Sequence, residues 1–532
     1  MDYPVESFSE SERAALAPHF TNLDSPVFGL VDLPETVKGA LFARYSRYQG
    51  TLRRLYLDEF AADSTGQARP FDGAEGERAA KLYERIFLGY GDDSVAQLGG
   101  AHIACEYVSN VMTKVLQRGR LASYLEQSTR YIPYDAQMEG TGGYRYWRNP
   151  ELGPEYARAM DLLFDTYSRM LPQVESWAAD RFPRGDDENE AAHARSIRAK
   201  ALDLLRGLLP AASLSHMGIF ASGQAYEQMI LRLVASPLPE ARDYGLMILN
   251  ELKAMMPSFV SRVERSDRGG EWVNYLEERN QAADRWAGRL GLDRTRGGEQ
   301  EAGPSVRLLD VQGSEDELLA ALLFEAAGSP ESEARAAVRT LPPDQRAQML
   351  GELIGERRNR RHRPGRGFES LRYRFEVVSD YGAFRDLQRH RMLTVQWQTL
   401  TPDLGAGVPG ELDEAGVGDD YRRALDASRG EYARLVDAGL PHLAPYALCL
   451  GYRIRYVLDM NAREAMHLIE LRSGREGHPG YRAVAHELHA QIADVHPAVA
   501  AAMTFVDADT EPRLERILSE IRTQARQVAA SQ

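Results

Sequence analysis

Two stretches of the chain, AHIACEYVSNVMTKVLQRGR (residues 101–120) and LRYRFEVVSDYGAFRDLQRHR (residues 371–391), follow the same plan. In each, apolar residues first alternate with polar ones, which is the period of a half-buried strand, and then recur at helical spacing. Each stretch ends in Gln-Arg-x-Arg, and the two motifs lie 389 − 118 = 271 residues apart, close to half of the chain. This shared order of strand, short helix and basic motif predicts a tandem duplication.

A third element repeats downstream of each basic motif. Ser222-Gly-Gln224 and Asn461-Ala-Arg463 both follow an apolar stretch and both lead into a helical pattern. Between the halves, residues 289–305 are rich in glycine and charge and poor in large apolar side chains, which is typical of a linker. We therefore expect one domain over residues 1–288 and a second over residues 306–532.

Composition limits the class of protein. The chain has 532 residues, of which 43% are hydrophobic and 27% charged, so a largely disordered protein is excluded. Its formal net charge is −14, which argues against nucleic acid as a partner because such proteins need positive charge to displace counterions. No signal peptide and no apolar run of membrane-spanning length is recognised, so we expect a cytoplasmic protein that does not enter a membrane. Cys105 and Cys449 stand in apolar contexts and are expected to be buried in the core.

The first basic motif continues as RGRLASYLEQSTRY over residues 118–131. Arginine suits phosphate because its planar fork donates two parallel hydrogen bonds. The run resembles the signature of flavin-dependent thymidylate synthases: Arg-His-Arg, two residues, Ser, one residue, Asn-Glu, one residue, Ser, one residue, Arg-Tyr. Gly119 replaces the His and Leu125 replaces the Asn. The matching positions are Arg118, Arg120, Ser123, Glu126, Ser128, Arg130 and Tyr131.

The second basic motif, RHRMLTVQWQTLT over residues 389–401, keeps the Arg-His-Arg opening of that signature. Trp397 stands in place of the Glu, and Thr401 stands in place of the last Arg. The resemblance thus extends to both halves, with weak identity outside the motifs.

The resemblance implies a helix-rich α+β fold, with two tandem domains forming an intramolecular pseudo-dimer and an active site between them. It further implies the conversion of dUMP to dTMP with methylenetetrahydrofolate as the one-carbon donor and with bound FAD that NADPH reduces. A homodimer of the chain, a pseudo-tetramer, is the expected assembly. No enzyme cysteine and no metal ion is expected to take part in the reaction.

The two halves depart from the family pattern in complementary ways. The first half keeps the residues that the resemblance assigns to dUMP, but Ser222 and Gln224 replace the family's flavin-site Asn and Arg, and Leu233 replaces its catalytic Arg. The second half keeps the flavin-site residues and Arg472, which the resemblance makes the catalytic group facing the uracil. The implied substrate-binding residues are Glu126, Gln127, Ser128, Arg130, Arg206 and Arg389, and the implied cofactor-binding residues are Arg389, His390, Arg391, Asn461, Arg463, Arg118, Arg120 and Ser123.

A non-catalytic relative is the alternative. The family's flavin-contacting histidines upstream of the basic motif are missing at residues 91–98 and at residues 363–370. Such a protein would bind nucleotide or flavin and act as a sensor or scaffold. The basic cluster at residues 357–366, RRNRRHRPGR, is either a replacement pyrophosphate-binding loop or a solvated surface loop.

Overall fold

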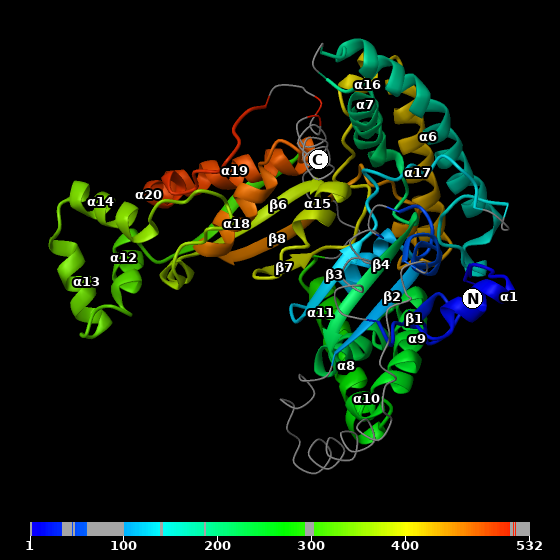
Figure 1. The fold of residues 1–532 in the computed structure, drawn as a ribbon, viewed down its shortest axis with the longest axis horizontal. Coiled ribbons are helices and arrows are strands. Elements are labelled where there is room, and N and C mark those ends of the chain that lie inside the picture. The colour runs from blue at the N-terminus through cyan, green and yellow to red at the C-terminus, as the bar shows by residue number, and fades with distance from the viewer. Residues whose placement is uncertain are drawn as a thin grey trace. The chain divides into compact units, whose positions relative to one another are not determined.

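Two four-stranded antiparallel sheets form the framework of the computed structural model (Figure 1). The first sheet has the strand order β1-β2-β4-β3 and the second the order β5-β6-β8-β7, so the two halves share one topology. This identity confirms the helix-rich α+β fold and supports the predicted duplication. The structure describes residues 3–33, 45, 48–60, 100–138, 142–185, 188–292, 303–510, 514 and 517.

Corresponding helices also begin at corresponding capping residues. Ser109 caps the helix that follows the second strand of the first sheet, and Asp380 caps its counterpart in the second half. Ser222 and Asn461 cap the helices that follow β4 and β8. In all four cases the cap side chain accepts a backbone N–H of the first turn, which satisfies a donor that the helix itself cannot.

The bounds of the elements in the first half are α1 (Glu10–Leu16), β1 (Val27–Gly29), α3 (Leu52–Leu55), η1 (Tyr56–Phe60), β2 (Gly100–Ser109), α5 (Asn110–Leu116), β3 (Ala122–Glu126), η3 (Pro150–Leu152), α6 (Gly153–Arg181), α7 (Glu190–Leu205), η4 (Arg206–Leu208), β4 (Leu214–Ser222), α8 (Gly223–Val234), α9 (Pro239–Met255), α10 (Pro257–Val260), η5 (Ser266–Gly270) and α11 (Glu271–Arg289). Those of the second half are β5 (Ser305–Gln312), α12 (Glu315–Leu323), α13 (Glu331–Thr340), α14 (Pro343–Ile354), η6 (Arg366–Ser370), β6 (Arg372–Asp380), α15 (Tyr381–Leu387), β7 (Thr394–Trp397), α16 (Glu411–Glu414), α17 (Gly418–Asp437), η7 (Ala444–Ala447), β8 (Arg453–Asn461), α18 (Ala462–Arg472), α19 (Pro479–Val495) and α20 (Pro497–Ala501).

The predicted alternation holds along β6 but ends early in β2. Tyr373, Phe375 and Val377 are all buried, as expected. In β2 a bulge between Cys105 and Val108 shifts the register, and Tyr107 there has a φ of 58°. The alternation predicted for this strand therefore breaks at Tyr107, because the extra residue of a bulge leaves the ladder.

By their contacts, the residues divide into two compact units that do not follow the two halves of the sequence. Unit 1 consists of Met1–Ser168, Pro210–Gly298 and Asp426–Leu448, and unit 2 of Arg169–Leu209, Glu299–Leu425 and Cys449–Gln532. Each unit thus contains one sheet with its covering helices and a segment taken from the other half of the chain. α7 and η4, from the first half, belong to unit 2, and η7, from the second half, belongs to unit 1.

Backbone hydrogen bonds hold these exchanged segments. In unit 1, the N–H of Ala211 donates to the carbonyl of Leu448 at 2.7 Å. In unit 2, the N–H of Leu450 donates to the carbonyl of Leu209 at 2.8 Å. The two bonds correspond under the repeat, since 450 − 211 and 448 − 209 both equal 239, so the exchange is a symmetric property of the duplicated fold.

Each sheet packs against the two helices that follow its last strand in sequence. α8 and α9 cover the first sheet, and α18 and α19 contact the second (Figure 1). Cys105 and Cys449 are fully buried, which confirms their expected place in the core. The boundaries at residues 289–305 stay a prediction; residues 293–302 lie outside the described part. Among the described helices, none has both the length and the apolar character that a bilayer crossing requires.

Candidate functional site

Arg206 lies in unit 2 although the first half of the chain supplies it. It opens η4, directly after α7, and only 3% of its side chain is exposed. One guanidinium nitrogen donates to Asp386 Oδ2 at 3.2 Å, and Nη2 lies 3.8 Å from Asp380 Oδ1. Nη2 is buried and has no hydrogen-bond partner. Because a buried donor without a partner costs free energy, this atom marks a place where an anionic ligand would be stabilised.

The start of α15 is shaped to receive this guanidinium. A Cβ added at Gly382 would lie 3.0 Å from both Nε and Nη2 of Arg206. Asp380, one residue before α15, uses one carboxylate oxygen to accept the N–H of Ala383. Desolvation raises the pKa of Asp380, and the positive charge of Arg206 opposes that shift. The absence of a side chain at Gly382 therefore lets Arg206 lie across the beginning of the helix.

Asp386 connects Arg206 to two arginines from the second half. Its other oxygen, Oδ1, lies 3.8 Å from Arg389 Nη1. Arg472, at the end of α18, lies near enough for Asp386 to favour its charged form. Arg389 is exposed and Arg472 is half-buried. Two predicted ligand-binding arginines, one from each half of the sequence, thus pair with one carboxylate inside unit 2, and the charge of that carboxylate also acts on Arg472.

His390 lies between Glu464 and Arg472, and both of its ring nitrogens have partners. Nδ1 is 2.8 Å from Glu464 Oε1, and Nε2 is 3.0 Å from the Nε of Arg472. Burial lowers the pKa of His390 to about 4 although Glu464 favours protonation, so the ring is neutral at pH 7. Burial alone would raise the pKa of Glu464, but the bonds with His390 and His467 outweigh it and hold that pKa at about 2.

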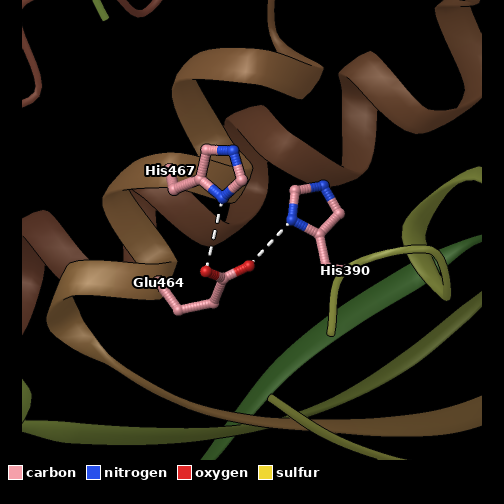
Figure 2. Close-up of side chains that lie close together, drawn as sticks. All are labelled: His390, Glu464 and His467. Atoms are coloured by element: carbon pink, nitrogen blue, oxygen red, sulfur yellow. Dashed lines mark hydrogen bonds and ion pairs between the residues drawn. The ribbon is translucent and has the colours of Figure 1, made fainter. Parts of the chain in front are cut away.

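His467 completes a cluster with these two residues (Figure 2). Its Nδ1 lies 3.3 Å from the second oxygen of Glu464, one turn earlier on α18. The ligand atoms of His390, Glu464 and His467 all lie within 4.8 Å of one another, a spacing that a metal ion could bridge. An arginine N–H directed at His390 Nε2 disfavours a metal, because metallation at Nδ1 would place the ring's proton on Nε2, against another donor.

The rest of the predicted flavin set is distributed around this cluster. Arg391 is exposed after α15. Asn461 accepts the N–H of Glu464 as the cap of α18, and Arg463 donates to the carbonyl of Pro364 at 3.0 Å. In the basic cluster at residues 357–366, Arg357 is buried and paired with Glu470 at 2.6 Å, so this arginine has a structural role.

The predicted substrate residues after β3 lie in unit 1. Glu126 is buried at the end of β3, where it is paired with Lys114 at 3.1 Å and accepts a bond from Gln117. Gln127 is buried too, and its side-chain oxygen accepts from Arg145 at 2.7 Å. These two side chains are therefore part of a buried polar network.

The remaining predicted residues of the first half are more accessible. Arg118, Arg120 and Ser123 are exposed. Ser128 and Arg130 are half-buried, and the Ser128 hydroxyl accepts the N–H of Arg130 in a tight turn. No contact within the described residues tests the binding roles assigned to them, which stay predictions.

Unit 1 holds no arginine at the position that Arg206 occupies in unit 2. The same spacing in the repeat leads to Pro445, and the neighbouring Tyr446 donates to Glu240 Oε2 at 2.7 Å. Glu240 also accepts the backbone N–H and the hydroxyl of Ser109, at 2.8 and 2.6 Å. The counterpart position in unit 1 is thus filled by buried protein side chains.

Sequence reasoning missed the acidic and imidazole partners of the arginines. Asp380 had a visible signal, since an Asp before a helical pattern is a common cap. Glu464 and His467 lie three residues apart on one helix, so they share a face. Nothing in the sequence indicates that Asp386 faces Arg206, because 180 residues separate the two.

The sequence matches a known protein family in both halves. The model of the thymidylate synthase complementing protein family matches residues 48–258 and 314–498. The chain belongs to this family. One match includes β2, β3 and β4 and the other β6, β7 and β8, which confirms the family resemblance of both halves.

Two relatives align with this chain over nearly their whole length. A UPF0159 protein of Chlamydia muridarum is 37% identical over 97% of this chain and 99% of its own length. A UPF0159 protein of Thermoplasma acidophilum is 31% identical over 91% of this chain and 98% of its own length. Among solved structures, the UMP/dUMP methylase PolB from Streptomyces cacaoi bound with 5-Br dUMP aligns with 38% of this chain and 95% of its own, at 22% identity and a TM-score of 0.31.

Proposed function

We propose that this chain is a thymidylate synthase that converts dUMP to dTMP by reductive methylation, in a site of unit 2 to which both halves contribute. The observation that carries the proposal is that Arg206, from the first half, and Arg389, from the second, both pair with Asp386. Arg472 lies 3.0 Å from His390, the residue next to Arg389. Membership of the thymidylate synthase complementing protein family supports the reaction class.

The charges of this cluster suit a nucleotide monophosphate. Three guanidinium groups face two carboxylates, Asp380 and Asp386, which leaves a positive balance. Arg389 offers an exposed guanidinium for a phosphate oxygen, whereas Arg206 is buried, lies 3.8 Å from Asp380 and adds positive charge from behind. Arg472 is the group we assign to the uracil, where fixed positive charge stabilises the negative charge that develops on the ring.

FAD fits part of the predicted residue set. Arg389 and Arg391 are exposed guanidinium groups that suit its pyrophosphate. Asn461 and Arg463 would hold it from the start of α18, although both already make contacts with the protein. Reduced FAD supplies the electrons of a reductive methylation, NADPH being the reductant and methylenetetrahydrofolate the one-carbon donor. The protein's own part is to bind the nucleotide anion and to polarise the uracil.

For unit 1 we propose a secondary role in nucleotide binding. Glu126, Gln127, Ser128 and Arg130 follow β3, and Arg118, Arg120 and Ser123 surround its beginning. Ser128 and Arg130 are the more accessible pair and the better candidates for direct contact, because Glu126 and Gln127 are tied into the buried network.

A non-catalytic nucleotide-binding protein is the second candidate. The pairing of Arg463 with Glu369 at 3.4 Å favours it, because this contact competes with a cofactor for the guanidinium. Such a protein would bind dUMP without turnover.

Titration calorimetry with dUMP, followed by flavin absorbance of the purified chain, tests the proposal. We expect binding of dUMP that Arg472→Ala and Arg206→Lys weaken, and a yellow protein after incubation with FAD. Arg198→Ala is a matched control, since Arg198 lies on α7 and pairs at the surface with Glu175. Equal dUMP affinity in wild type, Arg472→Ala and Arg206→Lys would contradict the proposed site.

A further inference from the structure

The side chains of His390, Glu464 and Arg472 hold one another in fixed orientations. His390 is 6% exposed and Glu464 is 5% exposed, so neither side chain is able to exchange its partner for water. Figure 2 shows His390 and His467 directed at opposite oxygens of the Glu464 carboxylate. The cluster is therefore a fixed arrangement in which each proton has a defined place.

The proton positions follow from the partners. Arg472 Nε carries a hydrogen at every accessible pH, so His390 Nε2, 3.0 Å away, has to be the acceptor. A neutral ring with an acceptor at Nε2 carries its proton on Nδ1. That nitrogen faces Glu464 Oε1 at 2.8 Å, and an ionised carboxylate accepts its hydrogen.

We infer that Glu464 fixes His390 in the Nδ1–H tautomer and that His390 thereby positions the guanidinium of Arg472. His390 is in this sense a positioning residue, which acts through Arg472. The inference rests on the proposed function only for what Arg472 does to a ligand, and not for how Arg472 is held.

Two further contacts define the orientation of Arg472. The ring of Tyr481, on α19, lies 5.5 Å from the centre of the guanidinium. Asp386 attracts this group and Arg389 repels it. Tyr481 also hydrogen-bonds to the guanidinium, so its hydroxyl and ring hold Arg472 together with the bond from Nε to His390.

The residues at the equivalent positions of unit 1 support a role in ligand binding for His390, Glu464 and Arg472. The repeat places Gly119, Ala225 and Leu233 where unit 2 has His390, Glu464 and Arg472. All three members are replaced together, although β4 and α8 keep the fold of β8 and α18. The three side chains are therefore not needed to build the fold and act as one set.

Nitrogen NMR of the full chain labelled with ¹⁵N-histidine tests the tautomer without any ligand. The His390 signals are assigned by their loss in His390→Gln. We expect Nδ1 to be protonated and Nε2 unprotonated between pH 6 and pH 8. A glutamine at 464 offers His390 Nδ1 either a carbonyl oxygen or an amide N–H, and the second arrangement competes with the bond from Arg472. Glu464→Gln should therefore give a mixture of tautomers, whereas Glu487→Gln, on the exposed side of α19, should leave the tautomer unchanged. A protonated Nε2 in the wild type would overturn the inference.

A matched pair of variants tests the positioning. His390→Gln keeps an acceptor near Arg472, and His390→Phe keeps the ring without one. We expect His390→Phe to weaken dUMP binding about tenfold or more, and His390→Gln to stay within about threefold of wild type. The same pair is read out by the ¹⁵Nε–¹H signal of Arg472, which should be protected from exchange in wild type and His390→Gln and lost in His390→Phe.

The outcomes separate the inference from the proposed function. Failure of the wild type to bind dUMP would defeat the proposed function, while the nitrogen signals of His390 and Arg472 would still decide the inference. Binding by the wild type that His390→Phe does not change would defeat the inference alone. A joint shift of the His390 and His467 signals on adding one equivalent of Zn²⁺ would also overturn it, because metal coordination has to remove the Nδ1 proton.

Discussion

At the scale of single residues, we expect Arg206 to contribute both to the stability of the fold and to the binding of dUMP. Its charge compensates Asp380 and Asp386, whose side chains are 25% and 13% exposed. Replacing it leaves these carboxylates partly desolvated beside each other. We expect Arg206→Ala to lower the free energy of unfolding by about 2–4 kcal/mol at pH 7.

The pH dependence of that loss has a definite sign. Without Arg206 the raised pKa of Asp380 rises further, and a raised carboxyl pKa costs stability as the pH increases. The destabilisation, measured by urea unfolding, should therefore be smaller at pH 5 than at pH 8. The surface control Arg198→Ala should change stability by less than about 0.5 kcal/mol. A loss for Arg206→Ala that does not depend on pH would argue against this role.

The close approach of Arg206 to Gly382 is tested by adding a single methyl group at Gly382. An alanine Cβ would approach the Arg206 guanidinium to 3.0 Å, so the guanidinium has to move. We expect Gly382→Ala to weaken dUMP binding several-fold and to lower stability less than Arg206→Ala does, because the charge of Arg206 is kept and alanine favours a helix. Gly351→Ala is the control, because α14 leaves open space around that Cβ. Unchanged affinity for dUMP in Gly382→Ala would contradict the account of this contact.

At the scale of elements, Glu240 connects three segments of unit 1. It stands in the first turn of α9 and accepts from Ser109 at the end of β2 and from Tyr446 of η7. Burial raises the pKa of this carboxyl to about 7. A group whose pKa is raised on folding stabilises the protein below its unfolded pKa, near 4.5, and loses that contribution as the pH rises to about 7.

Glu240→Gln should reduce the slope of stability against pH between about 4.5 and 7. The titration of Glu240 changes the free energy of unfolding by on the order of 3 kcal/mol over this pH range. Glu106, whose pKa burial also raises to about 7, retains part of the slope in the variant. Glu278→Gln, exposed on α11, should keep the whole slope. Urea unfolding at four pH values measures the difference, and equal slopes in Glu240→Gln and wild type would show that Glu240 does not titrate in this range.

The elements also show what local sequence can predict. Strands β2 and β6, the helices after them and the linked basic motifs were predictable because periodicity and capping residues act over a few residues. The bulge at Tyr107 was not predictable. The backbone N–H of Tyr107 donates to His216 Nδ1 at 3.1 Å, and His216 is 109 residues away along the chain. The role of Arg206 came from resemblance alone; its partners Asp380 and Asp386 depend on tertiary contacts that no local pattern encodes.

At the scale of the whole molecule, the exchanged segments decide how the chain folds. Unit 2 contains residues 169–209 of the first half, and unit 1 contains residues 426–448 of the second. Neither half of the sequence therefore includes a complete unit. No local pattern reveals that α7 packs in the unit of the second sheet.

This exchange predicts that the halves fold only together. Residues 1–288 and 306–532 expressed alone should give little soluble, cooperatively melting protein, because each lacks a segment that completes its core. Expressed in the same cells, they should copurify and recover dUMP binding. Two fragments that each melt cooperatively when expressed alone would contradict the described exchange.

The proposed function requires that this single chain make dTMP from dUMP. The most direct measurement is mass-spectrometric detection of dTMP after incubating the purified full-length protein with dUMP, methylenetetrahydrofolate, FAD and NADPH. The account predicts dTMP with the wild type, none when methylenetetrahydrofolate is left out, and a loss of at least about a hundredfold in Arg472→Ala. No dTMP from wild-type protein that demonstrably binds both dUMP and FAD would contradict it and would favour the non-catalytic nucleotide-binding protein.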